Sequence, residues 1–116
     1  MAKATNTLAK LDEIGKVDDS LETREVTWIA PNGEEVKFSV QTKKELSSAD
    51  NYALWRESKK MDEGDENADV MALRIHRTVF IDGEPVSIER ARSYKPSLKA
   101  AIINATAEVG EEPPKA

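Results

Sequence analysis

The apolar pattern of the chain is strongest between Ala68 and Val109, in the segment ADVMALRIHRTVFIDGEPVSIERARSYKPSLKAAIINATAEV. Two signals divide this segment: Asp82-Gly83 interrupts an apolar run, and Pro96 opens a new one. An Asp-Gly pair favours a tight turn, and proline is well tolerated in the first turn of a helix. The segment therefore predicts several short elements.

Residues 68–81 fit both a helix and a strand. The helical stripe would consist of Ala68, Met71, Ala72, Ile75 and Val79, and the strand face of Met71, Leu73, Ile75, Val79 and Ile81. The last four residues, 78–81, are β-branched or aromatic and precede a turn, which favours an extended end. We expect a helix from about Asp69 to Arg77 and then an extended stretch.

Two more helices are predicted after Gly83. Ser87 can cap a helix that runs to about Tyr94, with Ile88 and Ala91 facing inward and Arg90 and Arg92 facing outward. Pro96 suits the first turn of a last helix, which Gly110 would end. Its apolar stripe would consist of Leu98, Ala101, Ile102, Ala105 and Val109.

The N-terminal half contains a period-two pattern on both sides of Pro31-Asn32-Gly33. This pattern predicts a hairpin from Glu25 to Val40, with Asn-Gly supplying positive φ angles in the turn. A lone two-stranded ribbon is marginal in water, so the face that bears Trp28, Val36 and Phe38 needs a cover. We expect a helix to provide it.

Thr42-Lys43-Lys44-Glu45 matches a capping box, which predicts a helix from Lys43 to about Lys60. The acidic segment MDEGDEN at 61–67 follows. Its carboxylates suggest a cation site, but the spacing of a calcium loop is missing. A solvated linker is the simpler interpretation.

These patterns define an α+β protein in which an N-terminal β-hairpin packs on a helical C-terminal half. We expect a flexible N-terminal segment at 1–21, a single domain at 22–110 and a disordered tail at 111–116. The first segment has apolar residues at three-residue spacing, enough for one or two helical turns, and could fold on binding. These residues are Leu8, Leu11, Ile14 and Val17.

Composition argues against several classes of function. The 116 residues carry a net charge of −5 and no cysteine, so disulfides, thiolate metal sites and cysteine nucleophiles are excluded. An acidic chain is poorly suited to non-specific binding of nucleic acid. No signal peptide or membrane span is recognisable, which predicts a cytoplasmic protein.

Residue types that carry chemistry are scarce. His76 is the single histidine, and we expect it to be packed or on the surface. No glycine-rich phosphate loop or nucleophile motif occurs. We therefore predict a non-enzymatic protein without a catalytic site, metal, cofactor or small-molecule substrate.

A mildly basic strip lies within this acidic chain and consists of Arg74, Arg77, Arg90, Arg92, Lys95 and Lys99. One interpretation pairs its charges with neighbouring acids on a solvated face, and the other makes it a docking strip for an acidic protein partner. Trp55 falls beside the apolar stripe of its helix and is a candidate contact. The candidate partner-binding residues are Trp55, Arg74, Arg77, Arg90, Arg92, Tyr94, Lys95, Leu98 and Ile102.

The order of these features resembles the tail assembly chaperones of long-tailed bacteriophages. The resemblance covers roughly 26–109 and depends on the Asn-Gly hairpin, the T-x-x-E motif, the acidic loop, the Asp-Gly turn and Leu98-Lys99-Ala100-Ala101-Ile102 in the last helix. It implies a protein that binds the tape measure protein and keeps it soluble while tail tube protein polymerises around it, in the cytoplasm of a bacterial host. Many members also have a longer frameshifted form.

Two other hypotheses remain. The chain could be a structural phage component, such as a head–tail connector or a tail terminator, that assembles into rings as a homo-oligomer. A small DNA-binding regulator would use 87–94 and 96–109 as a helix-turn-helix, but its second helix has almost no side chains suited to DNA.

Overall fold

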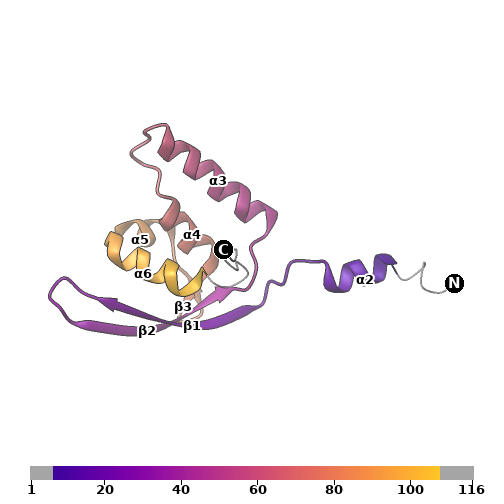
Figure 1. The fold of residues 1–116 in the computed structure, drawn as a ribbon, viewed down its shortest axis with the longest axis horizontal. Coiled ribbons are helices and arrows are strands. Elements are labelled where there is room, and N and C mark those ends of the chain that lie inside the picture. Colours follow the sequence, from indigo (N-terminus) through magenta and orange to yellow (C-terminus); the bar gives the residue numbers. More distant parts are fainter. Residues whose placement is uncertain (1–6, 108–116) are drawn as a thin grey trace, which may run out of the picture.

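The computed structural model describes residues 7–107 and has an α+β fold, as the sequence predicts. A four-stranded antiparallel sheet has the order β1-β2-β3-β4, with strands Leu21–Ile29, Glu35–Lys43, Val79–Ile81 and Glu84–Pro85. The helices are α2 (Thr7–Ile14), α3 (Ser48–Asp62), α4 (Val70–Thr78), α5 (Ile88–Ser93) and α6 (Pro96–Thr106). Helices α4, α5 and α6 gather on one side of the sheet, whereas α3 leans outward and α2 projects from the body (Figure 1).

The predicted hairpin is present and longer than expected, because β1 and β2 pair from Leu21↔Lys43 to Ile29↔Glu35. Its turn differs from the prediction. Gly33 has a φ of 88°, but Asn32 does not share this positive φ, and the Gly33 N–H donates to the Ala30 carbonyl at 2.8 Å. Pro31 fixes a negative φ at the first central position, so the loop has three residues with one left-handed glycine.

One face of the hairpin forms the floor of the core. Val26 and Val40 are fully or almost fully buried, and α6 contacts β1 above them. The indole Nε1 of Trp28 donates to Ser97 Oγ at 3.0 Å, which fixes the start of α6 over the strand. The predicted helical cover therefore exists. The buried apolar residues of the core are Val26, Val40, Ala72, Ile75, Val79, Val86, Ala91 and Ile102.

The predicted capping box at Thr42–Glu45 is wrong. Thr42 belongs to β2, where it pairs with both Glu22 and Val79 and is buried. Helix α3 instead begins after Ser47, whose hydroxyl accepts from the Asp50 N–H while the Asp50 carboxylate accepts from the Ser47 N–H. The strand continues because β3 supplies a second neighbour, which local sequence does not reveal. The helix also extends to Asp62, past the predicted end.

The segment from 69 to 106 follows the prediction closely. Asp69 caps α4, which ends at Thr78 and passes directly into β3. Asp82 and Gly83 both have positive φ, as a tight hairpin turn between β3 and β4 requires. Ser87 caps α5, and Pro96 occupies the first turn of α6. The predicted Val109 contact, the Gly110 stop and the tail at 111–116 lie outside the described residues.

Candidate protein-binding surface

Helix α3 carries an exposed group of aromatic and basic side chains, formed by Tyr52, Trp55, Arg56 and Lys59 and here called the aromatic patch. The rings of Tyr52 and Trp55 lie 5.9 Å apart, and the two side chains remain 57% and 56% exposed. The Arg56 guanidinium lies 5.9 Å from the Tyr52 ring and the Lys59 ammonium 5.7 Å from the Trp55 ring. Such cation–π contacts hold the rings in place before any partner arrives.

The opposite side of α3 is attached to the body by charge. Asp50 is 3% exposed and is the one buried residue of the helix. Its carboxylate accepts from Arg77 Nε on α4 at 2.8 Å and from Lys43 Nζ on β2 at 3.0 Å. Because one carboxylate joins three elements, it sets the direction in which α3 leaves the body and therefore where the aromatic patch faces.

The pKa of Asp50 reflects this arrangement. Burial is the largest effect and raises the pKa, but the hydrogen bonds from Lys43, Arg77 and the Ser47 N–H together outweigh it. The pKa consequently lies below its ordinary value of 3.8. Asp50 is therefore ionised at neutral pH, as its two cationic partners require.

Further polar contacts link α3 to α4 and α4 to α6. The Glu57 carboxylate accepts from the Asp69 N–H at 2.9 Å. Asp69 caps α4 by accepting from the Ala72 N–H at 3.0 Å and also pairs with the buried Lys99 of α6 at 2.5 Å. Burial opposes ionisation of Asp69 most strongly, yet Lys99 and the cap hydrogen bond still lower its pKa. The three helices are thus joined through two carboxylates, Glu57 and Asp69.

The fold divides the predicted partner-binding residues between the interior and the surface. Ile102 is 0% exposed and belongs to the core. Arg77 holds Asp50, and Lys99 of the basic strip holds Asp69. Arg74 lies partly buried on α4. For Arg77 and Lys99 the interpretation that pairs these charges with acids is confirmed, but the pairs are partly buried and attach helices to each other, whereas a solvated face was expected.

The other predicted contacts remain accessible, on α5 and the start of α6. Arg90, Arg92 and Lys95 are exposed, whereas Tyr94 and Leu98 are half-buried and pack against the core. Arg92 also lines a cleft of about 250 Å³ with Glu57, Lys60 and Ile88. This cleft lies between α3 and α5, so the structure brings Arg92 close to the inner side of α3, while Trp55 lies on the outer side.

Sequence reasoning missed most of the aromatic patch. Tyr52, Trp55, Arg56 and Lys59 have helical i, i+3, i+4 and i+7 spacing, which places them on one face. That spacing was available as a signal. The apolar stripe of the helix indicated its inner side, where Ala53 and Leu54 are half-buried, but it did not indicate that the buried Asp50 would attach this side to the body.

A second open surface follows β1, which is an edge strand of the described sheet. The pairing pattern turns the backbone N–H and C=O groups of alternate residues, including Glu25, Thr27 and Ile29, away from β2. A groove of about 580 Å³ separates this edge from α6 and is lined by the same three residues and by Ala101 and Ala105. The groove can accept an extended chain.

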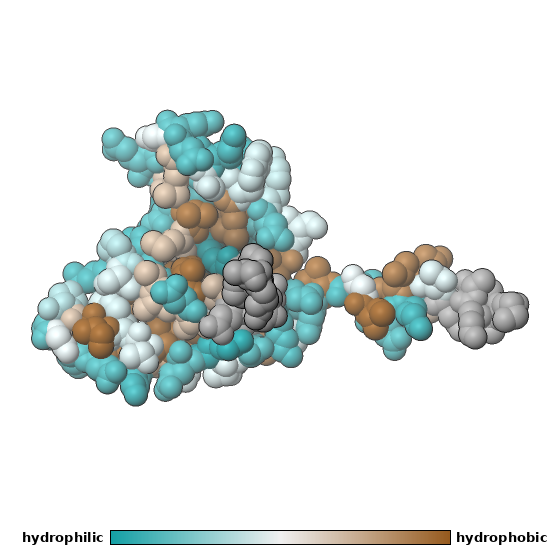
Figure 2. All heavy atoms as spheres, in the orientation of Figure 1, coloured by the Kyte–Doolittle hydropathy of each residue, from teal (hydrophilic) through white to brown (hydrophobic). Residues whose placement is uncertain are grey.

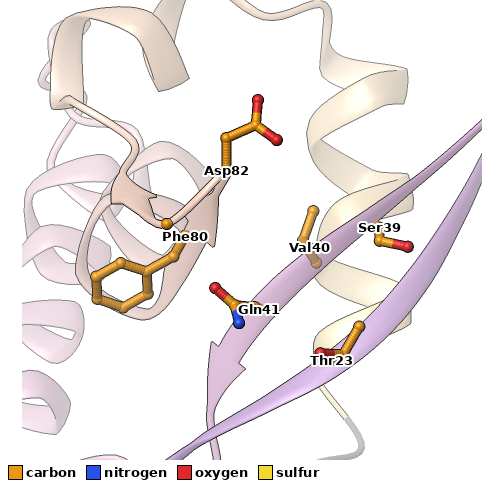
Figure 3. Close-up of a pocket in the computed structure, with 7 residues that line it drawn as sticks. Thr23, Ser39, Val40, Gln41, Phe80 and Asp82 are labelled. Carbon is orange, nitrogen blue, oxygen red and sulfur yellow. The ribbon is translucent and has the colours of Figure 1, made fainter.

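A groove of about 460 Å³ lies between the hairpin and the β3–β4 turn, and Figure 3 shows Thr23, Ser39 and Gln41 on one side and Phe80 and Asp82 on the other. Asp82 is its single ionisable lining residue. Within residues 7–107, no group of three His, Asp or Glu side chains is placed to hold a metal ion.

His76 has a structural position. Its Nδ1 lies 2.8 Å from the Val86 carbonyl oxygen. A carbonyl can only accept, so this nitrogen donates and fastens α4 to the segment that leads into α5.

Comparison of the chain with protein-family models, curated proteins and solved structures finds no match. Among the described helices, none has the length and apolar character needed to cross a bilayer. The aromatic patch on α3, the exposed basic residues of α5 and the open β1 edge are therefore the basis for a functional proposal.

Proposed function

We propose that this chain is a tail assembly chaperone of a long-tailed bacteriophage, which binds the tape measure protein without catalysis in the host cytoplasm. It would keep this long helical client soluble while tail tube protein assembles around it. The aromatic patch on α3 is the observation that supports the proposal most directly. Its residue types, Trp, Tyr and Arg, are those enriched at energetically important positions of protein interfaces.

The acidic composition suits the same role. A chaperone that exposes aromatic side chains needs charge elsewhere to stay soluble while it is empty. The chain has a net charge of −5, whereas the aromatic patch itself carries two cations. An amphipathic client helix with acidic flanks would place its apolar face on Tyr52 and Trp55 and its carboxylates near Arg56 and Lys59.

The test is co-expression of the chain with a candidate client, the tape measure protein of the phage that the proposal implies. Trp55→Ala should reduce the soluble fraction of the client and its recovery with the tagged chain, because the side chain contributes contact area and is not part of the core. Ile29→Ala is the matched control, since Ile29 is 57% exposed, as Trp55 is at 56%, but lies on β1. Equal client recovery with both variants would overturn the proposal for α3.

The exposed basic residues of α5 support a smaller part of the proposal. Arg90 and Arg92 would extend the docking surface toward acidic segments of the client. Reversal of both to Glu should weaken client binding at low salt and have little effect at high salt. Unchanged binding at low salt would remove these arginines from the docking surface.

A structural phage component is the second candidate, because two features favour self-assembly. Helix α2 projects away from the body, and the β1 edge is unpaired within the described residues (Figure 1). Light scattering separates the two roles, because a stable hexamer or larger ring favours the structural role. A monomer or dimer that changes when client is added favours the chaperone.

The DNA-binding hypothesis has less support. Its second helix would be α6, which packs against β1 and holds Ile102 in the core. The indole N–H of Trp28 also donates a hydrogen bond to Ser97 in the first turn of that helix. The N-terminal end of a recognition helix must be free to enter the major groove. Helix α6 would therefore have to leave the core in order to read DNA.

A further inference from the structure

We propose that helix α2 of one copy of this chain docks on the aromatic patch of a second copy. The inference concerns contacts between copies alone, so it stands independently of the proposed client. It rests on two unpartnered surfaces of opposite charge within the same chain.

Helix α2 is the first of these surfaces. It has eight residues and buries none of them. Leu8, Leu11 and Ile14 are 75%, 54% and 73% exposed and follow helical spacing along one side. Figure 2 shows apolar side chains on this helix, apart from the main body. Isolated helices shorter than about 12 residues are marginal in water, so α2 needs a surface that covers its apolar side.

The connection to β1 directs α2 away from its own body. The Asp18 carboxylate accepts from Ser20 Oγ at 2.6 Å and from the Ser20 N–H at 3.0 Å, forming a local turn. The Asp18 N–H donates to Glu45 Oε1 at 2.8 Å, and the Lys44 N–H donates to the Ser20 carbonyl at 3.2 Å. These contacts hold the part of the connection that adjoins β1 beside the end of β2. Helix α2 therefore extends outward, as Figure 1 shows, and the molecule measures 66 × 35 × 35 Å.

The aromatic patch provides a matching surface. Leu11 and Ile14 can cover the Tyr52 and Trp55 rings, since two amphipathic helices bury their exposed apolar sides when they pack together. Residues 7–19 contain two lysines and four carboxylates, a net charge of −2, whereas the patch has two cations and no acid. The acidic side chains around α2 and the cations of the aromatic patch would favour docking of α2 on the patch over contacts of α2 with α2 or of patch with patch.

A second copy suits this geometry better than the same copy. In the structure α2 points away from its own body, so for it to reach α3 of the same chain the connection at residues 15–17 would have to turn back. A neighbouring molecule can approach the projecting helix without any such change. Two copies can each dock α2 on the aromatic patch of the other, which gives a closed dimer. Alternatively, each copy can dock α2 on the next copy, which gives a head-to-tail chain.

The experiment uses sedimentation velocity of the full chain and two variants over a range of concentrations. The arm variant carries Leu11→Asp and Ile14→Asp, and the patch variant carries Tyr52→Ala and Trp55→Ala. All four side chains are more than half exposed, so circular dichroism should show both variants folded. We expect the unmodified chain to associate with increasing concentration and each variant to associate at least about thirtyfold more weakly, which corresponds to the loss of a binding hot spot.

A mixture of the two variants gives the decisive result. The arm variant keeps an intact patch and the patch variant keeps an intact α2, so an equimolar mixture should form mixed dimers that neither variant forms alone. Lys37→Ala, at an exposed position of β2 outside α2, the aromatic patch and the β1 groove, is the control and should associate like the unmodified chain. A monomeric unmodified chain, unchanged association of either variant, or a mixture without mixed dimers would each overturn the inference.

Discussion

Replacement of Asp50 should loosen helix α3 from the rest of the protein. The Asp50→Asn variant keeps the size of the side chain but removes the charge that Arg77 and Lys43 neutralise. A hydrogen bond to a charged group contributes about 1.5–3 kcal/mol, and loss of a helix cap about 1 kcal/mol. Both cations have side chains about 30% exposed, at 31% and 28%, so water compensates part of their loss.

These contributions predict a decrease of about 2 kcal/mol in the free energy of unfolding for Asp50→Asn and about 3 kcal/mol for Asp50→Ala. With a urea m value near 2 kcal/mol/M, the asparagine variant should unfold at a midpoint lower by about 1 M. Urea titration followed by circular dichroism measures this change. Asp12→Asn removes the same charge from an exposed site on α2 and is the matched control, with an expected change below about 0.5 kcal/mol.

Hydrogen exchange shows where the loss occurs. In Asp50→Asn, the amides of Ser48–Asp62 should lose protection before those of α4 and α6, because the carboxylate attaches α3 to Arg77 and Lys43. A variant that unfolds at the same urea concentration as the unmodified chain, with α3 protected, would refute the role assigned to Asp50.

Three further changes test the account. The folded-state pKa values of Asp50 and Asp69 are lowered from 3.8, so both carboxylates stabilise the fold fully above the unfolded pKa and lose this contribution as pH falls through the folded pKa values. The urea midpoint should therefore be constant near neutral pH and decrease below about pH 4. A midpoint that stays constant down to about pH 3 would contradict this. Lys99→Met should lower the free energy of unfolding by about 1–3 kcal/mol, measured by urea titration, because Asp69 loses its buried partner; no loss would show that the pair contributes nothing net. Gly33→Ala should cost about 1–2 kcal/mol in thermal unfolding, because φ is 88° there although the space for a methyl group is open; an equally stable variant would refute the turn assignment.

The predictable parts of the fold are those that local chemistry specifies. The Pro-Asn-Gly turn predicted the hairpin, Ser87 and Pro96 marked the starts of α5 and α6, and the β-branched run after Arg77 marked β3. In each case the responsible residues lie within a few positions of the element that they start or end. Such signals depend little on the rest of the chain.

The errors came from contacts between distant segments. Thr42 matched a helix cap, but β3, which lies 37 residues further along the chain at Val79, pairs with it and extends the strand. The ion pairs that attach α3 were likewise hidden, because Asp50 pairs with Arg77, 27 residues away. A hydrophobic periodicity does not indicate which charged residues pair between distant segments. Ile102 was a candidate partner contact, but α6 packs it into the core.

Hydrogen exchange of the full chain with and without the tape measure protein distinguishes client binding at α3 from client binding at β1. We expect added protection across Ser48–Asp62, the helix that carries Trp55, and no change along β1 when client is bound. Protection confined to β1 and the facing residues of α6, with the exchange of α3 unaltered, would contradict it.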